Sequence, residues 1–265
     1  MSDDPAAAAA ADAVAQLDAL TRRLRVECPW DREQDERTIV PHTLEEAYEL
    51  ADAAHRRDDS KLLDELGDVL FQVHFLSLLL EERGAGSLAD VAEHVRQKLI
   101  RRHPHVFGDV EVAHAGEVLA NWDQIKRTEA GREPGIFGEV PENLPSLLYA
   151  RKVQRRTASS GLDVDAPPYE AVAGELEQLE AAGDPDARFH EVGDLLFAAV
   201  NVARKLKVDP ELALRASADR FRSRVEAAEA LAQAAGESWD DLGTERQLGF
   251  YAQALLDDET RQHPS

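Results

Sequence analysis

The sequence has little of what marks a secreted or membrane-embedded protein. Its 265 residues include one cysteine, Cys28, which excludes an internal disulfide framework and suits a reducing compartment. The first fifteen residues are acidic and alanine-rich, and they lack the basic segment that opens a signal peptide. The most apolar stretch, residues 69–80, is interrupted by three polar side chains and is too short to cross a bilayer.

Basic residues are also scarce. The chain has 30 lysines and arginines against 52 aspartates and glutamates, which gives a formal net charge of −22. Such a field repels polyanions, so we do not expect a DNA- or RNA-coating role. Together these absences predict an acidic cytoplasmic protein with no membrane and no nucleic-acid polymer among its partners.

Helix signals dominate what is present, and hydrophobic residues, at 43%, suffice for a core. Thr43-Leu-Glu-Glu46 has the spacing of a capping box, Ser60 and Ser87 are expected N-caps, and Asp209-Pro210-Glu211 combines a cap with a first-turn proline. Strand alternation is almost absent, so we predict an all-α fold. The expected helices span about 12–26, 44–56, 61–83, 88–102, 114–129, 143–156, 168–181, 187–206, 210–235 and 244–257.

An internal repeat divides the chain. Glu65-Leu-Gly-Asp68-Val-Leu-Phe71 recurs 126 residues later as Glu191-Val-Gly-Asp194-Leu-Leu-Phe197. In both halves an acidic helix precedes this motif and a basic helix follows it, so we predict two repeated helical-bundle modules. The predicted organisation is a flexible tail at 1–15, a first module at 16–130, a glycine- and proline-rich linker at 131–145, a second module at 146–257 and a tail at 258–265.

Carboxylates on an apolar helix need an explanation. On a helical wheel, the apolar residues of 62–80 point in almost every direction, which predicts a buried helix. Glu65, Asp68 and Gln72 form one narrow polar stripe on it. Buried carboxylates are costly unless they are protonated or paired with a cation. A buried ion pair with arginine or lysine is the structural alternative to a functional site.

The preceding helix adds Glu46 and Glu49, one turn apart. A short turn near residues 57–60 makes the two helices antiparallel neighbours, so Glu46, Glu49, Glu65 and Asp68 can face one another around one space. Four hard oxygen ligands without sulfur suit Mg²⁺ or Mn²⁺. Taken alone, Glu46 and Glu49 could equally form a solvated helix face.

A basic island could supply phosphate-binding groups. Lys98 and Arg102 share one helix face, as do Trp122 and Lys126 further along. Side chains of this kind most often lie on the protein surface in ion pairs. Beside metal-binding carboxylates, however, such cations and an indole predict a pocket for a nucleotide polyphosphate.

These motifs resemble a known family. Glu46-x-x-Glu49 followed by Glu65-x-x-Asp68 is similar to the metal motif of the all-α nucleoside triphosphate pyrophosphohydrolases, which dimeric dUTPases and phosphoribosyl-ATP pyrophosphatases share. Cys28-Pro-Trp-Asp31-x-x-Gln34, Arg101-Arg-His-Pro-His-Val-Phe107 and the two-module layout narrow the resemblance to the MazG family, over residues 16–256.

The resemblance implies Mg²⁺-dependent (or Mn²⁺-dependent) hydrolysis of NTP or dNTP to the monophosphate and pyrophosphate by a helical homodimer. It also implies roles for particular residues. Metal-ligating and catalytic roles are implied for Glu46, Glu49, Glu65 and Asp68, and substrate-binding roles for Lys98, Arg102, Trp122 and Lys126.

The second module departs from the family pattern. Gln178 replaces one carboxylate of its acidic helix, while Glu175, Glu191 and Asp194 remain. Arg220 and Arg224 stand in for the Lys98/Arg102 pair, but Tyr251 and Leu255 replace Trp122 and Lys126. We therefore predict that the first module does most of the catalysis. A nucleotide-sensing or partner-binding protein with weak turnover is the alternative function, and a purely structural bundle is a third.

Overall fold

The computed structural model describes residues 4–114, 117–118, 121–122, 125, 135–138 and 140–262. Every regular element within these ranges is a helix, so the prediction of an all-α fold is confirmed. In the described part of the chain, no helix is both long and apolar enough to span a bilayer.

The chain folds as two compact units, Met1–Glu129 (unit 1) and Ala130–Ser265 (unit 2). The module boundaries derived from the repeat remain a prediction, because the units reflect packing and not repeated sequence. The described helices of unit 1 are α1 (Pro5–Glu27), α2 (Pro29–Glu33), α3 (Glu36–Arg56), α4 (Asp59–Glu82), α5 (Leu88–Arg102) and α6 (Pro104–Phe107). Those of unit 2 are α8 (Ser146–Ser159), α9 (Tyr169–Ala181), α10 (Pro185–Lys205), α11 (Pro210–Ala234), a 3₁₀ turn at Trp239–Asp241 and α12 (Thr244–Gln262).

Capping explains where the first helices begin. The side chain of Asp4 accepts a hydrogen bond from the backbone of Ala6, so α1 starts at Pro5. Residues 5–15, which we expected to form a flexible tail, are therefore helical. Asp35 forms a capping box with Thr38 and starts α3 eight residues earlier than expected. The prediction of Thr43 as an N-cap is wrong: its hydroxyl lies inside α3 and donates to the Ile39 carbonyl.

Later caps agree better with the sequence. Ser87 caps α5 in a capping box with Asp90, and Asp209 caps α11 ahead of Pro210, as predicted. Asp58, and not Ser60, caps α4 by accepting a hydrogen bond from the backbone of Lys61. Asp58 is the better placed of the two because it directly follows the turn that ends α3.

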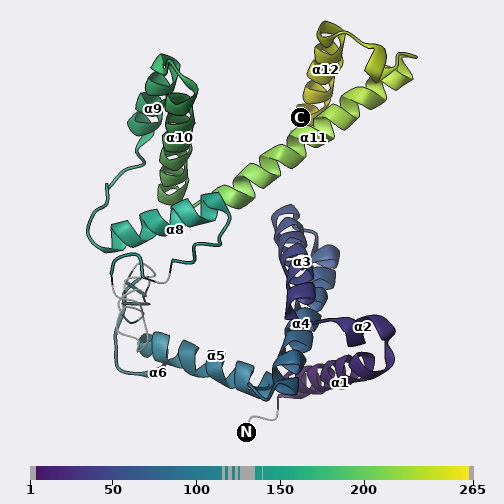
Figure 1. Cartoon of the computed structure of the whole chain (residues 1–265), viewed down its shortest axis with the longest axis vertical. Helices are drawn as coiled ribbons and strands as arrows, with labels where there is room; N and C mark the ends of the chain where they lie inside the picture. Colours follow the sequence, from purple (N-terminus) through teal and green to yellow (C-terminus); the bar gives the residue numbers. More distant parts are fainter. Residues whose placement is uncertain are drawn as a thin grey trace. The chain divides into compact units, whose positions relative to one another are not determined.

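In unit 1, α3 and α4 pack side by side and α1 lies against α4 (Figure 1). Ile39, Phe75 and Leu79 form the buried core between them. Arg25 ties α1 to α4 by pairing with Glu82, and its guanidinium lies 5.8 Å from the centroid of the Phe75 ring. The core fixes the α3–α4 hairpin on which the predicted carboxylates lie.

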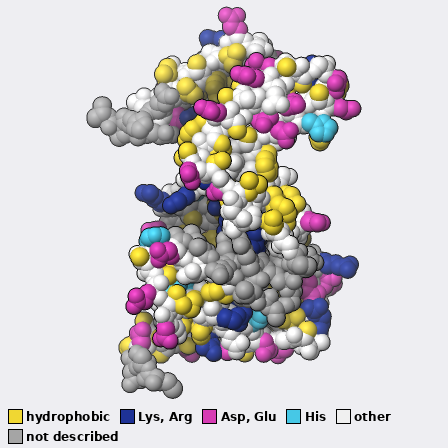
Figure 2. All heavy atoms as spheres, turned by 90° about the vertical axis from the view of Figure 1, so that its left-hand side faces the viewer, with side chains coloured by type: hydrophobic (Ala, Val, Ile, Leu, Met, Phe, Trp, Pro, Cys, Tyr) yellow, Lys and Arg dark blue, Asp and Glu magenta, His cyan; other side chains and the backbone are white. Residues whose placement is uncertain are grey.

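The α4 helix is not buried all round, contrary to the prediction from its helical wheel. An exposed apolar row runs along it, and the side chain at the start of the row, Leu63, is 75% exposed. Positions 126 residues later on α10 repeat this row, beginning with Phe189 at 79% exposed. The two rows comprise Leu63, Leu66, Leu70 and Val73 on α4 and Phe189, Val192 and Leu196 on α10. On the face of the molecule in Figure 2, apolar side chains likewise gather in patches.

Unit 2 repeats the hairpin with different packing around it. Helices α9 and α10 pack side by side, α8 contacts α10, and α11 pairs with α12 (Figure 1). Arg151 of α8 forms an ion pair with Asp209, the N-cap of α11. The α9–α10 pair therefore holds the second set of predicted carboxylates, as α3–α4 holds the first.

Candidate active site

Three of the four predicted carboxylates of unit 1 meet. Glu46 and Glu49 lie one turn apart on α3, Glu65 lies on α4, and one oxygen from each is within 4.8 Å of the others. The tight turn between the helices makes this possible, because Arg57 adopts the left-handed conformation (φ 57°) and sends the chain back at once. The predicted antiparallel neighbours are therefore present.

The fourth carboxylate, Asp68, lies at the edge of this group. Its side chain is exposed and lines, with Lys61, a surface hollow of about 640 Å³. Its charge still reaches the cluster, since it helps to raise the pKa of Glu46. Asp68 therefore acts on the group electrostatically.

Glu65 is the buried member, at 1% exposed. Its Oε2 atom is buried and has no hydrogen-bond partner among the described residues. Its other oxygen forms an ion pair with Lys61, one turn earlier on α4, whose Nζ also lies 3.7 Å from a Glu49 oxygen. The hydrogen bond from Lys61 holds the pKa of Glu65 below its ordinary value, so this carboxylate is ionised at neutral pH.

Lys61 was not foreseen, although its i, i+4 spacing to Glu65 is a recognisable signal. The ion-pair alternative considered for the polar stripe is therefore partly correct. One lysine does not balance the group, however. The pKa of Glu46 is raised, first because its charge loses solvent and then because Asp68, Glu65 and Glu49 repel it.

The residues present fit a hard divalent cation. The donor atoms are carboxylate oxygens, which Mg²⁺ and Mn²⁺ prefer. The buried, unpaired Oε2 of Glu65 and the mutual repulsion at Glu46 are both features that a cation would relieve.

Among the described residues, the predicted substrate-binding side chains on α5 do not join the carboxylates within unit 1. Glu65 lies 17 residues before the end of α4, about 25 Å along a helix axis. Lys98 and Arg102 lie on α5, which leaves α4 at that far end (Figure 1). The ring of Trp122 lies edge-on to His103, with centroids 5.2 Å apart, and Lys126 is outside the described residues.

A second cluster exists in unit 2. Glu175 of α9 and Glu191 and Asp194 of α10 each offer an oxygen within 4.8 Å of the others. Gln178, in place of a carboxylate, donates to Glu175 over 3.1 Å. Ala187 stands at the position that corresponds to Lys61, so this cluster lacks the internal lysine.

The predicted cations of the second module lie on α11. The Nε of Arg224 donates to Asp258 of α12 over 2.8 Å, so this arginine is engaged in the α11–α12 pair. Arg220 is exposed on the same helix. A role for either arginine toward a nucleotide stays a prediction.

Comparisons with known proteins agree with this arrangement. The model of the MazG nucleotide pyrophosphohydrolase domain matches residues 34–107, which include all four carboxylates of the first motif. The nucleoside triphosphate pyrophosphohydrolase/pyrophosphatase MazG of Thermotoga maritima is 39% identical over 236 residues, covering 88% of this chain and 91% of that protein. The nucleoside triphosphate pyrophosphohydrolase of Escherichia coli K12 is 40% identical over 218 residues, covering 79% and 83%. With a helical fold, a clustered carboxylate motif and relatives that align over most of their length, the chain belongs to the MazG family of nucleotide pyrophosphohydrolases.

Proposed function

We propose that this protein hydrolyses nucleoside and deoxynucleoside triphosphates to the monophosphate and pyrophosphate, at a site centred on the carboxylates of unit 1. The observation that carries the proposal is the buried Glu65, whose Oε2 is unpaired inside a group of acidic side chains. The names of the relatives from Thermotoga maritima and Escherichia coli support the same activity. The free Cys28 fits a cytoplasmic enzyme.

Glu46, Glu49, Glu65 and Asp68 would hold Mg²⁺, with Mn²⁺ as an alternative. A divalent cation, when bound, supplies neutralisation of phosphate charge and acidification of water. Lys61 keeps Glu65 ionised, and its ammonium competes with a cation for the same carboxylate. Glu49 has a side chain 46% exposed and can accept a proton from an attacking water molecule.

The phosphate-binding groups are proposed to come from a second copy of the chain. Lys98, Arg102, Trp122 and Lys126 retain their proposed role toward the nucleotide, yet α5 leads away from the carboxylates of its own unit (Figure 1). The exposed apolar rows of α4 and α10 supply surfaces for a homodimer. A dimer in which one chain completes the site of the other accounts for both features.

The division of labour between the units is part of the proposal. Unit 1 has the complete set of four carboxylates and contains the matched residues 34–107, so we assign it the main activity. Glu175, Glu191 and Asp194 of unit 2 would bind a cation more weakly, because Gln178 supplies a neutral amide.

The test is pyrophosphate release from a panel of four NTPs and four dNTPs, in Mg²⁺, in Mn²⁺ and in EDTA. Metal-dependent release of pyrophosphate, with an equal amount of the monophosphate, is expected, and the panel ranks the bases. Release of orthophosphate in place of pyrophosphate, or no release from any nucleotide, would reject the proposal.

A further inference from the structure

One side chain of unit 1 joins four of its helices. Arg25, in the last turn of α1, is 17% exposed and donates two hydrogen bonds, each over 2.8 Å, to the two carboxylate oxygens of Glu82 at the end of α4. It also donates to the backbone carbonyls of Asp31 in α2 and of Gln34, which directly precedes the N-cap of α3, Asp35. This set of contacts, here called the Arg25 clamp, ties α1, α2 and the start of α3 to the end of α4.

The clamp gives a role to a motif that the proposed carboxylate site does not use. Cys28-Pro-Trp-Asp31-x-x-Gln34 forms α2 and the bend that leads into α3, and its last two named residues offer their carbonyls to Arg25. The Nε2 of Gln34 donates to the Trp30 carbonyl over 2.9 Å, and Asp31 is 5% exposed. The motif therefore forms a fixed support for the first turn of α3.

A guanidinium suits this position because its donors lie in one plane and point in several directions. That of Arg25 serves a carboxylate and two carbonyls at once, and it lies 5.8 Å from the centroid of the Phe75 ring in the core. Its hydrogen bond lowers the pKa of Glu82, so the pair is charged at neutral pH. A lysine has the same charge on a single nitrogen and cannot reach the carboxylate and both carbonyls together.

The clamp closes the open end of the α3–α4 hairpin, and the turn at Arg57 closes the other end. Asp35 lies 22 residues before Arg57 and Glu46 lies 11 residues before it, about 33 and 16 Å along a helix axis. If α3 pivots about the turn as a rigid rod, Glu46 moves half as far as the start of the helix. A misplacement of about 1 Å at a catalytic group can cost about 100-fold in rate. An exposed pair between Arg83 and Glu36 also links the open end, but water screens it.

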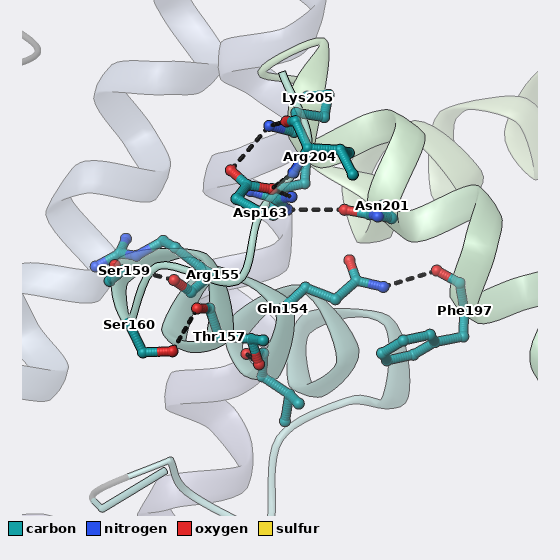
Figure 3. A network of polar contacts seen from close by, with 12 residues as sticks. Gln154, Arg155, Thr157, Ser159, Ser160, Asp163, Phe197, Asn201, Arg204 and Lys205 are labelled. Atoms are coloured by element: carbon teal, nitrogen blue, oxygen red, sulfur yellow. Dashed lines mark hydrogen bonds and ion pairs between the residues drawn. The ribbon is translucent and has the colours of Figure 1, made fainter. Parts of the chain in front are cut away.

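Unit 2 has a link of the opposite polarity at the open end of its hairpin. Arg204 and Lys205 reach from the end of α10 to Asp163 in the loop that follows α8, over 2.6 and 2.8 Å (Figure 3). Asp163 lies six residues before Tyr169, where α9 begins, whereas Gln34 lies two residues before the first residue of α3. The link in unit 2 therefore holds the loop, and the clamp in unit 1 holds the start of the helix itself.

We propose that Arg25 is a positioning residue for hydrolysis, because its clamp sets the distance between the carboxylates of α3 and Glu65 on α4. It acts through α3, whose Glu46 and Glu49 face Glu65. The role rests on the proposed function, since the geometry that the clamp fixes is that of the carboxylate site. A purely structural arginine would change the free energy of unfolding alone, whereas a positioning residue also changes the cation affinity and the kcat of the folded chain.

The experiment compares Arg25→Lys with Arg22→Lys in the full chain. Arg22 also donates two hydrogen bonds to a glutamate of α4, Glu81, but its further contact is with Asp18 in its own helix. Both variants keep the charge, and Arg25→Lys alone also releases the α2 and α3 carbonyls. Electron paramagnetic resonance measures Mn²⁺ binding in chains that also carry Glu191→Gln, so that the signal reports unit 1. Arg25→Lys should lose about tenfold in Mn²⁺ affinity and in kcat for pyrophosphate release, and Arg22→Lys should match the parent chain.

The single cysteine supplies a readout that needs no metal. Cys28 is the residue before α2, within the clamped segment, and it is partly buried. In EDTA, Arg25→Lys should raise its rate of reaction with an aromatic disulfide reagent several-fold, and Arg22→Lys should not. An unchanged thiol rate in Arg25→Lys would overturn the clamp.

Equal Mn²⁺ affinity and kcat in the two lysine variants would overturn the positioning role, whatever the loss of stability. If Arg25→Lys loses helix content by circular dichroism, Glu82→Gln weakens the clamp from its other side, with Glu81→Gln as the matched control. An active parent chain with an unaffected clamp variant would reject the positioning role alone. A parent chain that neither binds Mn²⁺ nor releases pyrophosphate would reject the proposed function and the positioning role with it.

Discussion

The two carboxylate clusters differ in composition but have the same formal charge. Unit 1 combines three clustered carboxylates, Asp68 at their edge and Lys61, whereas unit 2 combines three clustered carboxylates with Gln178 and has Ala187 at the lysine position. Four carboxylates and one ammonium leave as much negative charge as three carboxylates alone. The loss of one acid in unit 2 is therefore matched by the loss of the internal base.

The difference shows that a substituted motif is not simply a weakened one. If only the candidate ligands are counted, the motif of unit 2 has one carboxylate fewer than that of unit 1. Judged by electrostatics, it lacks the ammonium that competes for Glu65 in unit 1. Further along the same helices, Phe75 fills the core of unit 1, while Asn201, 126 residues later, lines an open pocket between α8 and α10 in unit 2. The repeat has thus kept its hairpin and changed both the charge and the packing around it.

The largest expected effect is on turnover, when one carboxylate charge is removed from either cluster. Glu65→Gln keeps the shape of the buried side chain but removes its charge, whereas Glu191→Gln makes the same change in unit 2. Loss of a metal ligand should cost more than the roughly 10–100-fold typical of an outer-shell partner. We expect Glu65→Gln to lose at least about 100-fold in pyrophosphate release and Glu191→Gln to keep most of it.

The control for this pair is Glu93→Gln, which removes an exposed carboxylate from α5 that pairs with Arg96. It should leave turnover unchanged. If Glu191→Gln were the inactive variant and Glu65→Gln the active one, the assignment of the main activity to unit 1 would be wrong.

Much of the hairpin and its carboxylates could be predicted from the sequence, because both depend on local rules. Apolar periodicity defined the long helix, and the short segment at 57–60 predicted the antiparallel turn. Glu46, Glu49 and Glu65 follow from that register. The start of α3 was missed because Asp35 and Thr38 form a capping box ahead of Thr43, which has the same kind of spacing.

Features that depend on what covers a surface could not be predicted. The helical wheel of α4 shows that its faces are apolar, but not that Leu63 and Leu70 are exposed within one chain. The open pocket beside Gln154 depends on the packing of α8 against α10, 43 residues apart in the sequence. The ion pair between Lys61 and Glu65 could have been predicted from their i, i+4 spacing alone.

The next largest effect concerns association. Leu70→Glu and Leu196→Glu place a charge at corresponding points of the two exposed apolar rows, where the side chains are 40% and 50% exposed. A charge left unpaired in an interface costs about 3–5 kcal/mol, or more than about 100-fold in the dissociation constant. We expect at least one of them to convert the proposed dimer to monomers in sedimentation velocity.

Gln16→Glu adds the same charge to an exposed position of α1, outside the two apolar rows and α5, and should leave association unchanged. The variant that dissociates identifies the unit that forms the interface. A chain that remains dimeric with both rows substituted would have its interface elsewhere, and a monomeric wild type would contradict the dimer altogether.

A smaller effect is expected on cation affinity. Lys61 is half exposed, so water screens its pair with Glu65, and its effect on cation affinity is roughly fivefold at most. Lys61→Ala should therefore strengthen Mn²⁺ binding at unit 1 by up to that factor, and Ala187→Lys should weaken it at unit 2. Electron paramagnetic resonance of free Mn²⁺ measures both. Unchanged binding in the two variants would show that the ammonium does not compete with the cation.

The last comparison concerns stability and separates the ion pairs of the two units. Arg204 and then Lys205 hold the pKa of Asp163 well below its ordinary value. A lowered carboxyl pKa stabilises the fold fully above the unfolded value of about 4, and this contribution decreases gradually as the pH falls from there through the lower pKa of the folded state. Asp163→Asn should therefore lower the unfolding free energy by about 1–2 kcal/mol at pH 7, and the difference from the wild type should shrink below pH 4.

Arg22→Ala breaks the pair with Glu81 in unit 1, where both side chains are 41% exposed, and should cost less than about 1 kcal/mol. Urea unfolding at pH 7 and pH 3 measures both variants. Arg204 is only 13% exposed, so water screens the network around Asp163 less than it screens the Arg22 pair. We therefore expect Asp163→Asn to lose more unfolding free energy than Arg22→Ala. An equal loss in both variants, or a loss for Asp163→Asn that is no smaller at pH 3 than at pH 7, would mean that the Asp163 carboxylate charge is not what stabilises this part of unit 2.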